Sequence, residues 1–282
     1  MTNILILGGT GKTGRRIARH LRAAGHPVRA VARTGGDMSF DLGDLTTWSA
    51  VLDGATSAYL VEPALQFTDE GRARIPKFIE AAVGAGVRRL VLLSAPAADQ
   101  ADHPLHAAER ATRDSGLEWT ILRPNWFAQN FSESFWLSGI LNGALYIPTG
   151  DGRTPFVDAD DIAEVAARAL LDDRHSGNTY ELTGPRAISF GEAVDMIGAT
   201  IGRTIRHVDI DPVNFVEQQI GFGVSPKAAR LLTDILTRLS RGGPGTTPTD
   251  DVHRALHRPA RTFENYVAEA AASGCWRRTT TS

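Results

Sequence analysis

Residues 4–14 read Ile-Leu-Ile-Leu-Gly-Gly-Thr-Gly-Lys-Thr-Gly, an apolar run followed directly by a glycine-rich turn. Gly8, Gly11 and Gly14 have the spacing G-x-x-G-x-x-G, and an amphipathic helical pattern comes right after them. A buried strand, a glycine turn and a helix in this order are typical of a dinucleotide-binding site. The stretch therefore predicts such a site at the start of the chain.

Each glycine has its own physical role in this motif. Gly8 supplies the positive φ of a tight strand-to-helix turn, because a residue without Cβ adopts it at little cost. Gly11 lets the backbone approach a pyrophosphate, and Gly14 lets the helix lie close to the sheet. The free N–H groups and the positive end of the helix dipole then face the phosphates. A P-loop is excluded, because that motif needs four residues between its glycines and only two separate Gly8 from Gly11.

The composition narrows the class of protein. The 282 residues carry a formal net charge of −2, which gives no electrostatic argument for a nucleic-acid partner or an anionic membrane surface. The single cysteine, Cys275, excludes an intrachain disulfide and a cysteine-built metal site, and we predict no metal. No apolar stretch is long enough to span a membrane. We expect a soluble cytoplasmic protein, a monomer or weak homo-oligomer, that acts on a small molecule.

Apolar runs alternate with helical patterns through the first half of the chain. The runs occupy residues 3–7, 27–32, 57–61, 88–93 and 118–122. Such alternation is typical of an α/β fold, with a parallel sheet covered by helices on both faces. The regularity ends after about residue 205, and residues 211–250 mix short helical runs with glycines and phenylalanines. This segment either covers a pocket or forms a small packed helical lobe, and both can be true.

The residue after the second predicted strand indicates which dinucleotide binds. Residues 28–32 form that strand and Arg33 follows it, where an NAD site would place an acid; we expect no acid beside it. An acid there binds the ribose 2′-hydroxyl of NAD, whereas a guanidinium pairs with the 2′-phosphate of NADP. The sequence therefore predicts NADPH as the cofactor rather than NADH. Lys12 and Arg15 either add positive potential to the site or belong to a solvated helix face.

Two residues further along are placed, in chain order, to contact the adenine. Asp41 could accept a hydrogen bond from its exocyclic amine, and Leu42 is adjacent. Asp44 is placed instead to cap the helix that begins near Thr46.

Several motifs along the chain resemble one family. They are the glycine motif of residues 8–14, Arg33, Leu60-Val61-Glu62-Pro63, Leu92-Leu93-Ser94-Ala95, His106-x-x-Glu109, Trp119 to Phe127 with Asn130, Phe156 to Ala163, and Arg258 to Phe263. In these motifs the chain resembles the NmrA-like branch of the atypical short-chain dehydrogenase/reductases, over nearly its whole length. The resemblance implies a Rossmann-type doubly wound parallel sheet that binds NADP(H), with a smaller C-terminal α/β substrate lobe. We place the first domain at residues 1–150 and the lobe at residues 151–282, with elements that interleave.

The glycine motif, the strand ends and the resemblance together indicate which residues line the site. Those expected at the cofactor are Gly8, Thr10, Gly11, Lys12, Thr13, Gly14, Arg33, Asp41, Leu42, Val61, Glu62, Pro63, Ser94, His106, Pro124, Asn125 and Phe127. Those expected at the substrate are Ala95, Trp126, Asn130, Phe131, Phe215 and Phe222. Aromatic side chains suit a flat conjugated substrate by stacking and apolar burial, although core packing explains Phe127 and Phe131 equally well.

The proton donor that is usual in the wider superfamily is absent. Its members place Tyr-x-x-x-Lys on one helix, and aligning the chain through Glu109 puts Asp102 at the tyrosine position and His106 at the lysine position. None of the four tyrosines precedes a lysine by four residues. Ser94 and His106 are the catalytic candidates, because Ser94 follows a strand at the ligand-binding edge and histidine titrates near neutral pH. His103 is an adjacent substitute.

These features favour an NADPH-dependent reductase that transfers hydride to a ketone or quinone of an aromatic small molecule, in secondary metabolism such as polyketide or antibiotic formation. A quinone needs little acid assistance, because its reduced anion is delocalised. Two alternatives remain open. One is an imine or iminium reductase of the alkaloid type, and the other is a non-catalytic NADP(H)-sensing regulatory protein.

Overall fold

The structure is a computed structural model that describes residues 3–64, 66–243 and 245–277. By its contacts the chain divides into two compact units. Unit 1 comprises Met1–Pro124, Ala159–Leu182 and Asp251–Arg258, and unit 2 comprises Asn125–Asp158, Thr183–Asp250 and Pro259–Ser282. The two units interleave along the chain. The first passage between them falls after residue 124 rather than 150, because the segment that follows Pro124 packs within unit 2.

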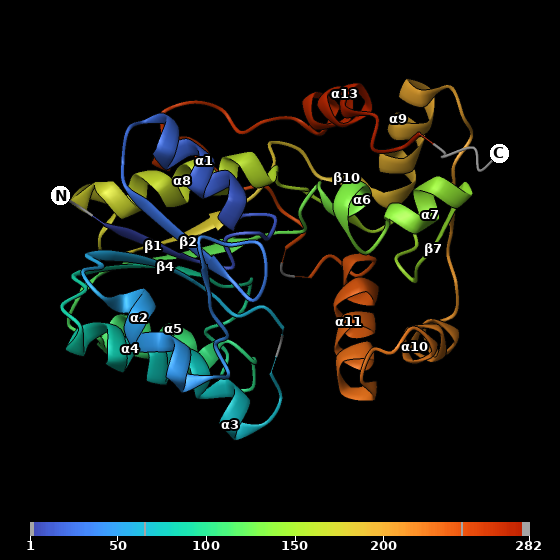
Figure 1. Cartoon of the computed structure of the whole chain (residues 1–282). Helices are drawn as coiled ribbons and strands as arrows, with labels where there is room; N and C mark the ends of the chain where they lie inside the picture. The colour runs from blue at the N-terminus through green and yellow to red at the C-terminus, as the bar shows by residue number, and fades with distance from the viewer. Residues whose placement is uncertain (1–2, 65, 244, 278–282) are drawn as a thin grey trace. The chain divides into compact units, whose positions relative to one another are not determined.

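Unit 1 is built on a seven-stranded sheet (Figure 1). Its strands lie in the order β3-β2-β1-β4-β5-β6-β9, and every pairing is parallel. The strands are β1 (Ile4–Leu7), β2 (Val28–Ala32), β3 (Met38–Ser39), β4 (Ser57–Val61), β5 (Arg89–Leu93), β6 (Glu118–Pro124) and β9 (Asn178–Leu182). The chain builds outward from β1 to β3 and then returns to extend the other side through β4. This reversal confirms the doubly wound parallel sheet, and ligands of such sheets bind outside the carboxyl ends of the strands beside it.

Helices cover both faces of this sheet. Figure 1 shows α1 (Gly14–Ala23) and α8 (Ala159–Leu171) on one face, and α2 (Trp48–Leu52), α4 (Arg74–Gly84) and α5 (His106–Asp114) on the other. The shorter elements of unit 1 are η1 (Leu45–Thr47), α3 (Asp69–Arg72), η2 (Asp173–His175) and α12 (Asp251–Leu256). Because both faces are covered, all four residues of β1 are buried.

The helices of unit 1 bury one face each. In α1, Ile17 and Leu21 are buried, whereas Arg15 and Arg19 are exposed, so the helical pattern after the glycines orients the helix on the sheet. On the opposite face, the rings of Trp48 and Phe78 pack edge-on with centroids 5.1 Å apart. The helix that positions the glycine turn is therefore held by the core and not by the turn alone.

Unit 2 is a smaller α/β assembly around an aromatic core. Its strands form two pairs, β7 (Ala144–Tyr146) with β11 (Arg206–Val208) and β8 (Arg153–Thr154) with β10 (Ile188–Ser189). Its helices are α6 (Asn130–Glu133), α7 (Leu137–Asn142), α9 (Phe190–Ile201), α10 (Pro212–Gly221), α11 (Pro226–Leu239) and α13 (Phe263–Ser273), and α9 and α13 lie side by side (Figure 1). None of the helices in the described ranges is long and apolar enough to cross a membrane.

The segment 211–250 is a packed helical lobe, one of the two forms expected for it. The helices α10 and α11 contact each other, and Phe215 and Leu236 from them are buried in the core of unit 2. Whether this segment also covers a pocket stays a prediction.

Candidate functional site

The glycine turn follows β1 at the carboxyl edge of the sheet. Gly8 has a φ of +65°, and a Cβ there would lie 2.9 Å from Cγ1 of Val61, the last residue of β4. A Cβ on Gly14 would lie 2.2 Å from the carbonyl oxygen of Gly8, so α1 approaches the turn as closely as a glycine permits. Gly11 is exposed, and a Cβ there would meet only the carbonyl oxygen of Gly8, at 3.1 Å. The turn thus leaves an open backbone surface in front of the first residues of α1.

Three polar side chains of the same turn take different positions. Thr10 is exposed and Lys12 is half-buried, with the Lys12 carbonyl accepting a hydrogen bond from Arg16 at 2.8 Å. Thr13 is buried, and its hydroxyl forms a 2.8 Å hydrogen bond with the hydroxyl of Tyr59 on β4. The prediction that Thr13 contacts the cofactor is therefore limited to its backbone, because its side chain joins α1 to β4.

Arg33 comes directly after β2 and is exposed. A Cβ on Gly35 would lie 3.5 Å from Cγ2 of Thr10, so the turn that carries Arg33 lies against the glycine turn. The expectation that no acid lies beside Arg33 stays a prediction, and the first acid after Arg33 in the chain is Asp37. Its carboxylate accepts a 2.7 Å hydrogen bond from the backbone N–H of Ala30 and pairs with Arg22 at 2.6 Å. That carboxylate is thus engaged with β2 and α1.

The residues expected at the adenine are only partly available. Oδ1 of Asp41 accepts a 2.8 Å hydrogen bond from the N–H of Gly43, which closes a tight local turn. The side chain of Leu42 is buried in the core of unit 1, and its contact with the adenine stays a prediction. Asp44 caps η1 through the N–H of Thr46, as the alternative for that residue predicted.

Glu62 and Pro63 follow β4. The Glu62 side chain is nearly buried and forms an ion pair with Arg74 of α4. Burial raises the pKa of the Glu62 carboxyl even though the Arg74 guanidinium opposes that shift. Pro63 is exposed. Glu62 therefore anchors the end of β4 to α4.

Ser94 belongs to a buried ionic network at the carboxyl end of β5. Its hydroxyl donates a 2.6 Å hydrogen bond to Oε1 of Glu109, a fully buried residue of α5. Arg123 of β6 donates to both oxygens of the same carboxylate, at 2.8 and 2.7 Å, and Arg113 adds a 2.8 Å contact. The other side of the Arg123 guanidinium donates to Glu181 of β9 at 2.9 Å.

This network decides what the Ser94 hydroxyl can do. Burial alone would raise the pKa of Glu109, but the hydrogen bonds from Arg123 and Ser94 outweigh it and hold that pKa below its ordinary value. An ionised carboxylate only accepts hydrogen bonds, so the Ser94 proton is directed to Glu109. The lone pairs of Ser94 Oγ remain for a ligand. Glu109 lies 15 residues from Ser94 in the chain, and such a spacing does not by itself identify the two as partners.

The histidines lie where β5 leads into α5. His106 is the first residue of α5 and is half-buried; within the described ranges its Nδ1 is buried and has no hydrogen-bond partner. His103 is also half-buried, and its Nδ1 accepts a 3.1 Å hydrogen bond from the backbone N–H of Leu105. Burial lowers the pKa of His103. Asp102 is exposed and Ala95 is half-buried in the same connection.

Pro124 ends β6, and Asn125 opens unit 2 with its amide already engaged. Asn125 Nδ2 donates to the carbonyl of Gly245 at 2.6 Å, and its Oδ1 accepts from the N–H of Trp126 and the hydroxyl of Thr154. The side chain therefore ties a loop to β8, which limits its expected contact with the cofactor. Phe127 is half-buried and forms a parallel bridge with Val157.

Two of the aromatic residues expected at the substrate belong to the core. Phe131 is fully buried, with ring centroids of Trp136, Phe156, Phe190 and Phe263 within 4.7–6.0 Å. Phe215 is buried in the same cluster. Both side chains pack inside unit 2, which is the core-packing alternative that the sequence left open for Phe131, and their contact with a substrate stays a prediction.

Of the other four residues expected at the substrate, Ala95 has been placed above and the remaining three differ in burial. Trp126 is half-buried, with its ring 5.4 Å from that of Trp136, and Asn130 is buried at the start of α6. Phe222 ends α10 and is 75% exposed. The structure thus leaves Trp126 and Phe222 with surface for a ligand.

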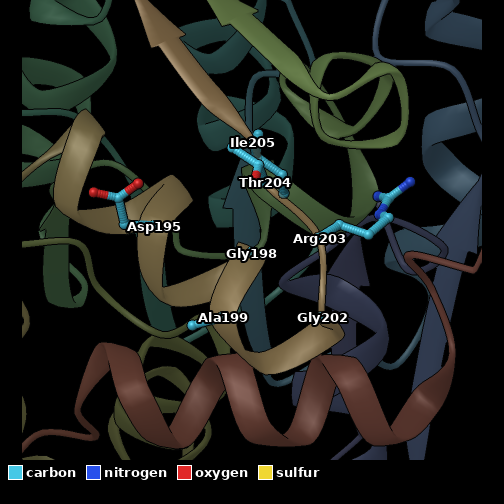
Figure 2. Close-up of a pocket in the computed structure, with 7 residues that line it drawn as sticks. All are labelled: Asp195, Gly198, Ala199, Gly202, Arg203, Thr204 and Ile205. Atoms are coloured by element: carbon cyan, nitrogen blue, oxygen red, sulfur yellow. The ribbon is translucent and has the colours of Figure 1, made fainter.

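A separate depression lies at the carboxyl end of α9 (Figure 2). Its volume is about 340 Å³, and it is lined by Asp195, Gly198, Ala199, Gly202, Arg203, Thr204 and Ile205. Figure 2 shows the Arg203 side chain extending away from Asp195, and its guanidinium donates to the carbonyls of Ile140 and Leu141. None of the residues predicted at the site lines this depression. Among the described residues, no group of three His, Cys, Asp or Glu is arranged to hold a metal ion.

Comparisons with known proteins fit this geometry. The model of the NmrA-like family matches residues 1–236. The uncharacterized oxidoreductase YesF of Bacillus subtilis is 33% identical, covering 95% of each chain, and the NAD(P)H azoreductase of Xenophilus azovorans is 30% identical, covering 96% of this chain and 99% of its own. The crystal structure of Citrobacter sp. triphenylmethane reductase complexed with NADP(H) is similar with a TM-score of 0.75 at 20% identity, covering 95% of this chain and 99% of that one.

Proposed function

Because this chain belongs to the NmrA-like family, we propose that it is an NADPH-dependent reductase of a ketone or quinone on a flat aromatic molecule. The observation that carries the proposal is the glycine turn at the strand reversal, with an arginine directly after β2. The names of the similar proteins support it, since an azoreductase and a triphenylmethane reductase both act on conjugated aromatic compounds. A setting in secondary metabolism stays a prediction.

The chain offers a suitable cradle for the pyrophosphate of a dinucleotide. Gly11 leaves the turn open where a side chain would block a close approach, and Gly14 brings the start of α1 against the turn. The ten-residue helix α1 has no acidic residue in its first turn, so its N–H groups and dipole favour an anion there. We propose that the pyrophosphate binds at this place, with Thr13 and Gly14 contributing backbone N–H groups.

Arg33 is proposed to select the phosphorylated dinucleotide. It is exposed beside the glycine turn, and the carboxylate of Asp37, four residues further along the chain, is bonded to Ala30 and Arg22. A guanidinium can pair with a 2′-phosphate through two hydrogen bonds, and hydrogen bonds to charged groups contribute about 1.5–3 kcal/mol each. We therefore expect NADPH to bind more tightly than NADH by at least about tenfold, or 1.4 kcal/mol.

The protein contributes binding and orientation of the substrate more than a reactive group of its own. NADPH supplies the hydride when bound, and the residues of the chain bind and orient the substrate and exclude water. We propose that Ser94 accepts a hydrogen bond from the ligand and donates none to it, because its proton is held by Glu109. A quinone suits such a site best, because the charge on the oxygen of its reduced anion is delocalised into the ring.

Two measurements test the proposal. Calorimetry with NADPH and NADH should show saturable binding with NADPH preferred, and Arg33→Ser should remove most of that preference while NADH affinity stays unchanged. Arg19→Ser is the matched control. Arg19 is likewise an exposed arginine, and it pairs with Asp160 of α8. Single-turnover oxidation of bound NADPH is then followed with a panel of aromatic ketones, quinones and iminium compounds. Tight NADPH binding without turnover of any acceptor would refute the reductase and favour the sensor.

A further inference from the structure

The chain lacks the tyrosine that usually polarises a substrate carbonyl in this superfamily, so any hydrogen bond from the protein to that oxygen comes from another side chain. Given the reductase proposed above, we infer that His103 supplies it, through Nε2–H of a neutral imidazole ring. Neither His106 nor Ser94, the two candidates from the sequence, meets the geometric requirement as well.

The tautomer of His103 follows from one hydrogen bond. The backbone N–H of Leu105 donates to Nδ1 of His103 at 3.1 Å. A backbone amide is only a donor here, so Nδ1 carries a lone pair, and in the neutral ring the proton is on Nε2. No residue in the described ranges forms a hydrogen bond with that N–H, which therefore remains available to a ligand.

The same contact disfavours a doubly protonated ring. A proton on Nδ1 would point at the N–H of Leu105, which would replace a hydrogen bond with two opposed donors. Burial also lowers the pKa of His103, and among the charged groups around it Arg123 and Arg72 act in the same direction. Glu109 and Asp102 oppose them but do not reverse the shift. The ring is thus a neutral donor at neutral pH, a state in which an imidazole can still polarise a carbonyl.

The position of His103 is consistent with this role. It lies in the connection of residues 94–105, which starts at the carboxyl end of β5, on the edge of the sheet where ligands of doubly wound folds bind. Successive turns shape this connection, in which the N–H of His103 bonds to Gln100 and that of His106 bonds to His103, both at 3.0 Å. Ala97 has a φ of +63°, a backbone conformation that residues other than glycine rarely adopt. Backbone strain of this kind clusters at functional sites.

Ser94 and His106, the two candidates from the sequence, differ from His103 in the hydrogen bonds that orient their side chains. The Ser94 hydroxyl donates to Glu109, so it has no proton to offer a substrate oxygen. His106 has a buried Nδ1 without a partner among the described residues, so no hydrogen bond there fixes which of its nitrogens carries the proton. A hydrogen-bond donor in catalysis works best when a third group holds it in one orientation. Of these three side chains, His103 both has such a group, the N–H of Leu105, and keeps a donor for the substrate.

The proposed step balances as follows. As NADPH is oxidised to NADP⁺, hydride adds to the carbonyl carbon of a ketone and the C=O electron pair moves to its oxygen. In a quinone, hydride instead adds to one carbonyl oxygen, and the electron pair moves through the ring to the second carbonyl oxygen, which carries the charge. His103 Nε2–H donates a hydrogen bond to that oxygen and keeps its proton, because a neutral imidazole is too weak an acid to give it up. Water supplies the proton that completes the alcohol or hydroquinone.

Two substitutions at one position separate the two nitrogens of the ring. Asn places its amide near Nδ1, so His103→Asn keeps an acceptor for Leu105 and removes the outer donor. Gln reaches the position of Nε2, so His103→Gln keeps a non-titrating donor. Removing one preorganised donor typically slows the chemical step by about 10²–10³-fold. We expect His103→Asn to slow single-turnover hydride transfer by about 10²-fold and His103→Gln to stay within about tenfold of the wild type.

The control variant is His253→Gln, at an exposed histidine of α12, which should react at the wild-type rate. In both His103 variants the NADPH affinity and the melting temperature should change little. The wild-type rate of hydride transfer should be independent of pH between about 6.5 and 9, whereas an imidazolium donor would lose about tenfold per pH unit above its pKa. A wild-type rate in His103→Asn, or such a pH-dependent loss, would overturn the inference while leaving the reductase standing. Absence of any turnover in the wild type would instead remove the function on which the inference rests.

Discussion

Alanine substitutions at Gly11 and Gly14 should have different effects. One should weaken cofactor binding, and the other should destabilise the fold. Gly14→Ala places a Cβ 2.2 Å from the carbonyl oxygen of Gly8 and 2.8 Å from its carbonyl carbon. Both neighbours are backbone atoms, so α1 and the turn must move apart by about 1 Å, and overpacking of this kind costs about 1–3 kcal/mol or more. At the upper figure the melting temperature falls by roughly 6–12 °C, since 1 kcal/mol shifts a protein of this size by about 2–4 °C.

Gly11→Ala should have the opposite profile. Its Cβ would meet a single atom, the Gly8 oxygen at 3.1 Å, and the backbone of Gly11 does not have a positive φ. The melting temperature should therefore change by no more than about 2 °C. The added methyl group instead occupies the open surface proposed for the pyrophosphate, so NADPH affinity should fall at least about tenfold, or 1.4 kcal/mol.

Thermal denaturation without cofactor and calorimetric titration with NADPH measure the two effects separately. Gly84→Ala, at the last residue of α4, is the matched control, because nothing lies within 4 Å of the place its added methyl group would occupy and both quantities should stay unchanged. A wild-type melting temperature of Gly14→Ala would contradict the predicted clash with the backbone of Gly8. Wild-type NADPH affinity of Gly11→Ala would contradict the proposed place of the pyrophosphate.

Other substitutions test the networks described above. Glu109→Gln breaks a buried ion pair and should cost about 3–5 kcal/mol in urea denaturation. The folded pKa of Glu109 is held below its ordinary value of 4.5, so its ionised form stabilises the fold above that pH and this contribution is lost as the pH falls through the folded pKa. The variant should therefore show a weaker loss of stability in acid than the wild type. Phe131→Ala should lose about 3–5 kcal/mol, as expected for a core ring, whereas Phe222→Ala should leave stability within about 0.5 kcal/mol, and equal effects would contradict the burial of the two rings. Ser189→Ala removes the capping box of α9 and should cost about 1 kcal/mol of unfolding free energy, with no change in NADPH affinity.

Local patterns in the sequence were sufficient to predict the parts of the fold whose causes are local. The run Ile4 to Leu7 and the glycines after it determine a buried strand, a turn of positive φ and a closely packed helix. The alternation of apolar runs and helical patterns predicted five strands of the parallel sheet. The strand β9 was not predicted, because residues 178–182 join the sheet only after the chain has passed through unit 2.

The candidate site shows a different limit. Phenylalanine is the residue type for both a substrate pocket and a core, so Phe131 could be placed only once its neighbours in unit 2 were known. Leu42 shows the same ambiguity in unit 1. The partner of Ser94 lies 15 residues away on α5, and Arg123 reaches it from β6. Contacts of this kind depend on the register of neighbouring elements, which spacing in one sequence does not specify.

The passages between the units, after residues 124, 158, 182, 250 and 258, also affect how the protein can be dissected. A fragment of residues 1–150 would lack α8 and β9, leaving β6 as an open edge and Arg123 without the carboxylate of Glu181. Unpaired strand edges pair with other chains, so such a fragment should aggregate on expression. Truncation therefore cannot yield a cofactor-binding half for biochemical work, and point substitutions in the intact polypeptide are the appropriate way to separate the roles of its parts.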